Sequence, residues 1–270
     1  MEEIAFDVFV IGSGIAGQTV AKSCVEAGLK VAVADNREFG GTCANRGCDP
    51  KKILLGAMEA YELSKNLKGK GVAKTPRINW GKLQKYKRNF TVNVPVATER
   101  VLKEKGIHLF HQSPKFIDER TLLVEGKKIS AQKIVIATGQ VPRKIEIKGS
   151  KHFKNSDDFL NLKKLPEHIV FVGGGYIGME FAHMAARAGA KVTVVDTGKR
   201  PLHAFDPDLV KALKKYSESL GITFIFEAKP TSLKKKRKKH ILSYEVKGGI
   251  KTIEAHMVFN TAGRVPALAE

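Results

Sequence analysis

The sequence predicts an α/β fold built from two similar units, each composed of a strand, a glycine-rich turn, a helix and a second strand that ends at an acid. In the first unit the apolar run 6–11 leads into the turn, and Asp35 follows the second strand. In the second unit the run 170–172 leads into the turn, and Asp196 follows. The first glycine precedes the acid by 23 positions in both units, from 12 to 35 and from 173 to 196. This repetition predicts two parallel βαβ units.

Both glycine turns have the composition of a dinucleotide-binding loop. Glycine lets the backbone approach a pyrophosphate closely, and the N-terminus of the following helix attracts its negative charge. The acid at the end of the second strand accepts a hydrogen bond from a ribose hydroxyl. We therefore expect two nucleotide sites. Their binding residues are predicted to be Gly12, Ser13, Gly14, Ile15, Ala16, Gly17 and Asp35 in the first unit and Gly173, Gly175, Tyr176, Ile177, Gly178 and Asp196 in the second.

Two cysteines, Cys43 and Cys48, lie between a Gly-Gly turn and the helix-compatible run 53–66. A helix that begins within this stretch favours a thiolate, because its N-terminal N–H groups and dipole stabilise negative charge. The spacing lets the two sulfurs meet within one helical turn, so that a disulfide can open and close. The alternative is a structural or zinc-binding pair. Zinc needs two further ligands, the only other cysteine is Cys24, and we predict no metal site.

The rest of the chain alternates short strands and helices. The segment 64–80 is rich in lysine and glycine and is predicted to be a loop. The segment 82–105 has a helical pattern that is interrupted at 91–95 by β-branched residues and proline. Further predictions are strands at 107–110, 114–117, 121–124 and 133–136, a crossover at about 142–154, and a capped helix at 156–160.

Composition limits the class of protein. A chain of 270 residues that is 43% apolar can form two domains with their own cores. It has no stretch of eighteen apolar residues, so we expect no membrane contact. Its N-terminus carries acid where a signal peptide carries base, and three cysteines do not make an extracellular disulfide framework. These features favour the cytoplasm.

The formal net charge of +20 raises the question of nucleic-acid binding. The densest basic run, 234–239, contains no aromatic residue that would stack on bases, and a strand-like pattern follows it at 241–246. A solvated hairpin tip is favoured over a nucleic-acid surface, and we predict no nucleic-acid partner. The excess charge still attracts anionic nucleotides and substrates.

The segment 40–52 resembles the redox-disulfide signature of the class I pyridine nucleotide–disulfide oxidoreductases, the family of dihydrolipoamide dehydrogenase, glutathione reductase and mercuric reductase. The signature is Gly-Gly-Thr-Cys, four residues, then Cys-x-Pro-x-Lys, and every fixed position is present. Two further segments resemble family motifs. Segment 137–139 resembles the motif where the chain leaves the first domain, and segment 261–266 resembles the motif where it returns to that domain. The resemblance implies two Rossmann-like domains of the three-layer type. These are an FAD domain at 1–145 that carries the redox disulfide, an NAD(P) domain at 146–262, and the start of a return to the FAD domain at 263–270.

The resemblance also implies roles for individual residues. Lys52 would point toward the flavin and pair with Glu180, while Tyr176 would shield the flavin until the nicotinamide binds. Cys48, nearer the flavin, would make the charge-transfer contact, and Cys43, the more exposed, would exchange with the substrate disulfide. The alternatives are a pair of surface charges and a tyrosine packed in the core. Further cofactor-binding positions implied by the motifs are Gly41, Thr42, Lys52, Ala137, Thr138, Gly139, Gly263 and Arg264.

The nicotinamide nucleotide is predicted from Asp196, whose carboxylate accepts from a 2′-hydroxyl and repels a 2′-phosphate, which favours NAD(H) over NADP(H). Thr197 and His203 stand where NADPH-selective members place arginines, although Lys199 and Arg200 lie close in sequence. The substrate would be a small-molecule or protein-bound disulfide or dithiol. Because of Asp196, dihydrolipoamide dehydrogenase is slightly favoured over an NADPH-dependent glutathione reductase. The segment Pro50-Lys51-Lys52 favours glutathione reductase instead.

The resemblance ends near position 266. Full-length members continue with a Gly-Asp that completes the flavin site and with a C-terminal interface domain. That domain makes the main contact of the homodimer and carries a His–Glu acid–base pair, and nothing in this sequence matches it. Mercuric reductase also needs C-terminal cysteines. A further alternative is therefore a catalytically incomplete FAD/NAD-binding fragment.

Overall fold

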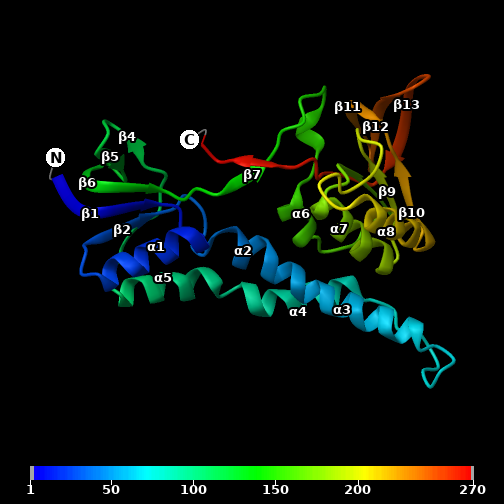
Figure 1. The fold of residues 1–270 in the computed structure, drawn as a ribbon, viewed down its shortest axis with the longest axis horizontal. Helices are drawn as coiled ribbons and strands as arrows, with labels where there is room; N and C mark the ends of the chain where they lie inside the picture. The colour runs from blue at the N-terminus through cyan, green and yellow to red at the C-terminus, as the bar shows by residue number, and fades with distance from the viewer. Residues whose placement is uncertain (1–2, 269–270) are drawn as a thin grey trace. The chain divides into compact units, whose positions relative to one another are not determined.

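The computed structural model describes residues 3–268 and divides the chain into two compact units (Figure 1). The first unit comprises residues 1–50, 88–141 and 266–270, and the second comprises residues 51–87 and 142–265. Parallel strands form the centre of each unit, which confirms the predicted α/β class. The last two residues of the predicted return segment, 269–270, lie outside the described residues.

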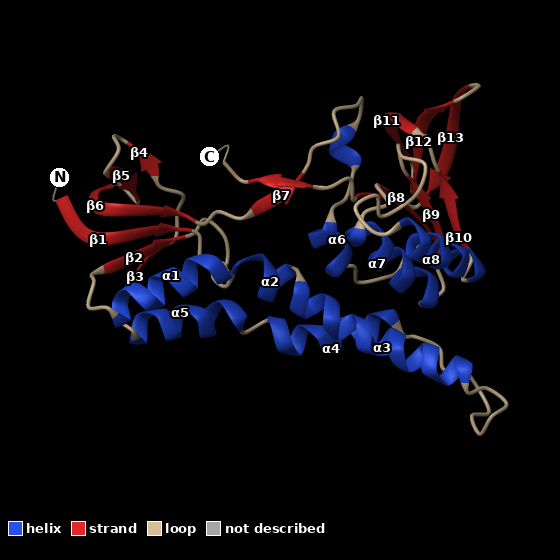
Figure 2. Cartoon of the chain, viewed as in Figure 1, coloured by secondary structure: helices blue, strands red, loops and turns tan. Residues whose placement is uncertain are grey.

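The first unit is organised on a six-stranded sheet in the order β3-β2-β1-β6-β5-β4 (Figure 2). Strands β3, β2, β1 and β6 are parallel, whereas β5 and β4 are added antiparallel. In β1, Val8 and Val10 belong to one core, while Phe6 and Phe9 belong to the other. The strands are β1 (Glu3–Ile11), β2 (Val31–Ala34), β3 (His108–Phe110), β4 (Lys115–Phe116), β5 (Thr121–Val124) and β6 (Lys127–Ile136), and the helices are α1 (Ile15–Glu26), α2 (Gly41–Arg46) and α5 (Val94–Glu104).

The second unit has three layers. A parallel sheet in the order β10-β9-β8-β14 lies between helices and an antiparallel sheet in the order β11-β12-β13. Along β8, Ile169 and Phe171 face the helical core, and Val170 and Val172 face the antiparallel sheet. The strands are β8 (His168–Val172), β9 (Lys191–Val195), β10 (Ile222–Ile225), β11 (Lys229–Lys236), β12 (Lys239–Val246), β13 (Gly249–Ala255) and β14 (Met257–Asn260), and the helices are η1 (Ser150–His152), α6 (Ser156–Leu160), α7 (Tyr176–Arg187) and α8 (Pro207–Ser219).

Two long helices cross between the units in sequence, α3 (Cys48–Asn66) and α4 (Trp80–Thr91). Residues 51–87 belong to the second unit because Leu54, Met58 and Trp80 are buried in the same core as Phe159. The indole N–H of Trp80 also donates to the Leu162 carbonyl at 2.8 Å. The short strands β7 (Gln140–Pro142) and β15 (Arg264–Pro266) pair where the chain passes between the units.

Most predicted elements are present, with shifted ends. The predicted loop at 64–80 begins later, because α3 continues to Asn66. The predicted interruption at 91–95 separates α4 from α5, and Pro95 occupies the first turn of α5, where its missing N–H costs nothing. Strand β6 is longer than the predicted 133–136, since it starts at Lys127. Among the described residues, no helix is both long enough and apolar enough to cross a membrane.

Candidate functional site

At two positions of the first glycine turn the backbone is packed so closely that no side chain fits. Gly12 has φ +111°, and a Cβ there would overlap the carbonyl of Ala137. A Cβ on Gly17 would overlap the carbonyl of Gly12. Helix α1 begins at Ile15 with no side-chain cap, so its first N–H groups remain directed at the turn. This is the backbone cradle that a pyrophosphate requires.

The cysteine segment is packed directly on this turn. Gly41 has φ +67°, and a Cβ there would overlap the Cα of Gly14. Glycine is therefore needed at position 41 for the approach of the two backbones. Sequence reasoning places Gly41 in the redox motif, and the structure shows the physical reason for its identity.

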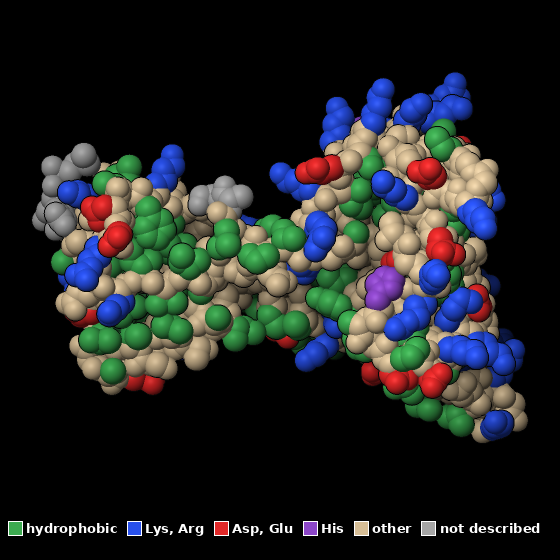
Figure 3. Space-filling model, turned by 45° about the horizontal axis from the view of Figure 1, so that its top comes forward, with side chains coloured by type: hydrophobic (Ala, Val, Ile, Leu, Met, Phe, Trp, Pro, Cys, Tyr) green, Lys and Arg blue, Asp and Glu red, His purple; other side chains and the backbone are tan. Residues whose placement is uncertain are grey.

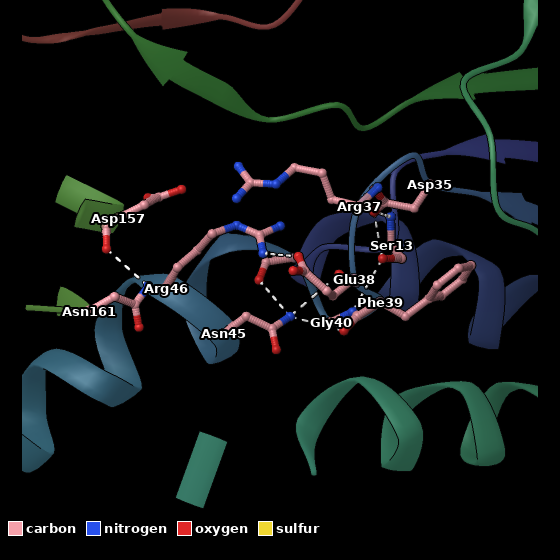
Figure 4. Close-up of polar contacts among 11 residues, drawn as sticks. Ser13, Asp35, Arg37, Glu38, Phe39, Gly40, Asn45, Arg46, Asp157 and Asn161 are labelled. Atoms are coloured by element: carbon pink, nitrogen blue, oxygen red, sulfur yellow. Dashed lines mark hydrogen bonds and ion pairs between the residues drawn. The ribbon is translucent and has the colours of Figure 1, made fainter. Parts of the chain in front are cut away.

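Asp35 stands at the end of β2 and holds the glycine turn (Figure 4). Its Oδ2 accepts from the backbone N–H of Ser13 at 2.8 Å and from the Ser13 hydroxyl at 2.6 Å, and its Oδ1 accepts from the N–H of Arg37 at 2.9 Å. The carboxylate is thus fixed beside the turn. In a dinucleotide-binding unit, the acid at this position accepts a hydrogen bond from a ribose hydroxyl.

Three residues missed by the sequence analysis hold α2 in place (Figure 4). Arg46 is nearly buried and forms an ion pair with Glu38 at 2.6 Å. The pKa of Glu38 is lowered, first by its backbone hydrogen bond and then by the charge of Arg46, which outweigh partial burial. The Asn45 amide donates to the Phe39 carbonyl at 2.9 Å. No local sequence pattern indicates these contacts, because each links α2 to the loop before it.

Cys43 and Cys48 are neighbours, as their spacing predicts. Cys43 lies inside α2, and Cys48 is the first residue of α3, after a break at Gly47. A Cβ at Gly47 would lie 3.2 Å from the Cα of Cys43, so glycine is needed for this approach. The pKa of the Cys43 thiol is raised, first by its hydrogen bond with Cys48 and then by burial. For Cys43 this is the opposite of the expected helix-stabilised thiolate.

The exposure of the two cysteines also differs from the expectation. Cys43 was predicted to be the more exposed, but Cys43 is half-buried and Cys48 is exposed. Cys43 lies within α2, whereas Cys48 opens a new helix. Cys24, the third cysteine, is half-buried in α1.

The lysine that pairs with Glu180 is Lys51, and the prediction of Lys52 is wrong. The Lys51 Nζ lies 2.7 and 2.9 Å from the two carboxylate oxygens of Glu180. Lys52 is exposed. Consecutive residues of a helix point about 100° apart, so only one of two adjacent lysines can face α7.

The second glycine turn repeats the arrangement of the first. Gly173 has φ +108°, and a Cβ there would overlap Thr261, while a Cβ on Gly178 would overlap the Gly173 carbonyl. Asp196 is buried at the end of β9, and its Oδ2 accepts from the N–H of Gly174. Its Oδ1 accepts from the N–H of Gly198 at 2.7 Å, as Asp35 accepts from the residue two positions after it.

Asp196 has a neighbour that Asp35 lacks in the described contacts. The Nε2 of His203 lies 3.4 Å from the Asp196 Oδ1. The imidazole packs on Gly198, where a Cβ would overlap the ring. Arg200 donates to the carbonyls of Leu202 and His203, so its guanidinium shapes this loop.

A cavity of about 320 Å³ lies at the second glycine turn. Tyr176, the first residue of α7, lines it with a 56% exposed ring, so it is not a core tyrosine. The predicted residues that line this cavity are Gly173, Gly175, Tyr176, Ile177, Asp196, Gly263 and Arg264, together with Thr197 and His203.

The remaining predicted positions lie in the first unit. Ala137 follows β6 and closes on Gly12, and exposed Gly139 accepts from the N–H of Ala267 at 3.0 Å. Exposed Thr138 lies between them. Thr42 is exposed at the start of α2. In residues 3–268 we find no group of three or more histidine, cysteine or acidic side chains arranged to hold a metal ion.

Residues 6–270 match the sequence profile of the pyridine nucleotide-disulphide oxidoreductases. Dihydrolipoyl dehydrogenase of Staphylococcus aureus is 33% identical over 270 residues, which cover 97% of this chain and 58% of that protein. Glutathione reductase of a Nostoc species is 33% identical over 229 residues, which cover 82% of this chain and 48% of the relative. Mercuric reductase of Bacillus cereus is 30% identical over 267 residues, which cover 97% and 42%.

Among solved structures, the Cu(II) complex of a mutant of the HOCl-induced flavoprotein disulfide reductase RclA from Escherichia coli matches with a TM-score of 0.86 and 26% identity. The match covers 98% of this chain and 58% of that one. The chain therefore spans 58% of the length of this structure and of the staphylococcal relative.

Proposed function

Since the chain belongs to the pyridine nucleotide-disulphide oxidoreductase family, whose members use FAD with NAD(P)H, we propose that it carries electrons between a nicotinamide nucleotide, FAD and the Cys43–Cys48 pair. The observation that supports this most is the packing of Gly41 on Gly14, because it joins the cysteine segment to the first dinucleotide turn. The balanced reaction consumes NAD(P)H, one proton and one disulfide, and it yields NAD(P)⁺ and two thiols.

The residues of the first unit fit FAD. The N-terminus of α1 and the turn 12–17 would bind the pyrophosphate, and Asp35 would orient a ribose hydroxyl. FAD held there would supply two-electron transfer between a nicotinamide nucleotide and a neighbouring disulfide. Cys48 would face that flavin and Cys43 would exchange with the substrate disulfide. Because the pKa of the Cys43 thiol is raised, a base has to take its proton before the thiolate attacks the substrate disulfide.

The residues of the second unit fit a nicotinamide nucleotide. The turn 173–178 would bind its pyrophosphate, and Tyr176 would cover the reacting ring. Lys51 takes over the positioning role that the motif suggested for Lys52, because it forms the ion pair with Glu180. Each of these groups belongs to the chain itself and is held by the contacts described above.

NAD(H) is the proposed nucleotide. Asp196 is buried, and its carboxylate lines the cavity at the end of β9, where a 2′-phosphate would meet negative charge. His203 is the one described residue that brings an ionisable nitrogen to this carboxylate.

The proposed substrate is a disulfide or dithiol, either small or protein-bound, with a dihydrolipoamide-type dithiol ahead of glutathione disulfide. We also propose a reducing, cytoplasmic environment, since a cysteine pair that cycles is typical of such compartments. A homodimer is proposed by analogy with the family.

The first experiment is the visible spectrum of the purified chain, before and after anaerobic addition of NADH and then NADPH. Bound flavin, with a long-wavelength charge-transfer band after reduction, is the expected result, and faster reduction by NADH would support the assignment of Asp196. Cys48→Ser is expected to keep flavin reduction by NADH and to lose disulfide turnover.

Two results of this experiment contradict the proposal in different ways. Retained turnover in Cys48→Ser would contradict the roles of the cysteines. A colourless protein that takes up no FAD, but still binds NADH by calorimetry, would identify the second candidate function, nucleotide binding without disulfide turnover.

A further inference from the structure

The antiparallel sheet of the second unit has an open edge. β13 is the last strand in the order β11-β12-β13, and in residues 3–268 no further strand pairs with its outer side. Its residues 249–252 are exposed, and Ile250 is 70% exposed. Near Glu254 the strand approaches β8, so the open stretch is 249–253, which spans roughly 17 Å. Unpaired backbone N–H and C=O groups of this kind accept an added strand.

The same sheet is strongly basic. Residues 229–256 contain nine lysines and arginines and two glutamates. A second basic segment, 143–154, contains five lysines and arginines and one glutamate, and it lies beside β11 because the N–H of Leu233 donates to the Lys148 carbonyl at 2.8 Å. These two segments hold a formal excess of +11 out of the +20 of the chain. Figure 3 shows lysine and arginine side chains gathered over this part of the second unit.

The hairpin between β11 and β12 carries its charge at a conformational cost. Lys236 and Lys239 are cross-strand partners on either side of a two-residue turn, and like charges at such positions repel. Arg237 in that turn has φ 53°, a left-handed conformation that favours glycine and costs an arginine about 1 kcal/mol. The ion pair of Lys239 with Glu254, at 2.5 Å, offsets part of the repulsion. The register places this hairpin beside the Ala255 end of β13, away from residues 249–253.

We propose that the open edge of β13 and its flanking lysines form a docking surface for an extended acidic protein segment, which pairs with residues 249–253 as a fourth strand. Lys247 and Lys251 flank and occupy the edge and would contact the carboxylates of the segment. A second copy of this chain is disfavoured as the partner, because pairing two such edges would bring their lysines together and like charges repel. Exposed aromatic rings, which bind nucleic-acid bases, do not occur among the described residues of this sheet.

The test uses the full chain and a labelled twelve-residue peptide of alternating glutamate and valine, followed by fluorescence anisotropy at low and moderate salt. Binding that weakens with salt is expected. A peptide of the same charge, with two valines replaced by proline, cannot pair along its length and is expected to bind at least about tenfold more weakly. A peptide in which glutamine replaces every glutamate is expected to bind as weakly as the proline peptide.

Two matched double variants each remove two positive charges, one pair at the edge of β13 and the other pair away from it. Lys247→Gln with Lys251→Gln is expected to weaken peptide binding about tenfold, whereas Lys211→Gln with Lys215→Gln, both exposed on α8, should change it less than about twofold. Hydrogen exchange should slow at residues 249–253 when the peptide binds.

Two outcomes would overturn the proposal. Equal binding of the proline peptide, with no change of exchange at β13, would mean that charge alone is recognised. Tighter binding of a DNA duplex than of the acidic peptide would mean that the basic surface serves nucleic acid. Both readouts are independent of flavin and of disulfide turnover, so they stand apart from the proposed redox function.

Discussion

The Nζ of Lys51 lies 2.7 Å from one carboxylate oxygen of Glu180 and 2.9 Å from the other, across 129 positions of sequence. The pair joins α3 to α7, because Lys51 stands in the first turn of α3 and Glu180 near the start of α7. Both side chains are partly exposed, so the ion pair itself contributes no more than about 1 kcal/mol to stability. The main effect of the pair is to fix the position of the positive charge of Lys51.

Replacing Lys51 by methionine is expected to slow reduction of bound flavin by NADH at least about tenfold, because the positioned charge is lost while the stem of the side chain is kept. Stopped-flow absorbance measures this rate. Lys52→Met is the control, since it removes the same charge one residue away, and its rate should stay within about twofold of the unchanged chain. A slow Lys52→Met with an unaffected Lys51→Met would restore the original assignment.

Gly41→Ala is expected to abolish FAD retention. The added Cβ would overlap the backbone of Gly14, and the φ of +67° is itself unfavourable for alanine. Absorbance at the flavin bands after gel filtration measures the retained cofactor. Gly28→Ala is the matched control, because Gly28 has φ +81° with nothing within 4 Å of its added Cβ, so it carries only the backbone cost of about 1 kcal/mol. Equal FAD content in the two variants would contradict the role of the close approach.

The reduced chain is expected to be alkylated at Cys48 at least about fivefold faster than at Cys43 at pH 8. Cys48 is exposed, whereas the Cys43 thiol is half-buried and its pKa is raised by the hydrogen bond with Cys48 and by burial, so less thiolate is present. Iodoacetamide labelling followed by peptide mass spectrometry gives both rates. In Cys48→Ser the Cys43 rate reports the thiol without its cysteine neighbour. Faster labelling of Cys43 in the unchanged chain would contradict the structure.

The sequence was sufficient for the repeated features of the fold. The spacing from glycine to acid predicts both βαβ units, because the turn and the helix between them have a fixed length. The sequence did not show which of the two adjacent lysines pairs with Glu180. That choice depends on where α3 begins, which is set by the break at Gly47. The attachment of residues 51–87 to the second unit depends on Trp80 packing with Phe159, a contact between distant positions that leaves no local pattern.

The half-buried side chain of His183, in the second unit, predicts how stability depends on pH. His183 donates from Nε2 to the Ser217 hydroxyl oxygen at 2.8 Å, a direction inferred because that hydroxyl donates onward to the Leu213 carbonyl. Its Nδ1 accepts from Arg187 at 2.9 Å. Burial, and then the charge of Arg187, lower the pKa of His183 to about 4, so the folded state favours the neutral ring.

A histidine whose pKa falls on folding stabilises the protein above its unfolded pKa, near 6.5, and this stability is lost as the pH falls from 6.5 toward 4. Because part of the ring is exposed, the expected loss of stability is reduced to about 2 kcal/mol.

The single tryptophan, Trp80, is buried in the core of the same unit, so its fluorescence in urea measures this unfolding. His183→Gln should be less stable than the unchanged chain at pH 7.5 and should lose less stability between pH 6.5 and 4.5. His108→Gln, at an exposed position of the first unit, is the control and should leave the Trp80 transition unchanged. Identical pH profiles for His183→Gln and the unchanged chain would show that His183 titrates alike in the folded and unfolded states.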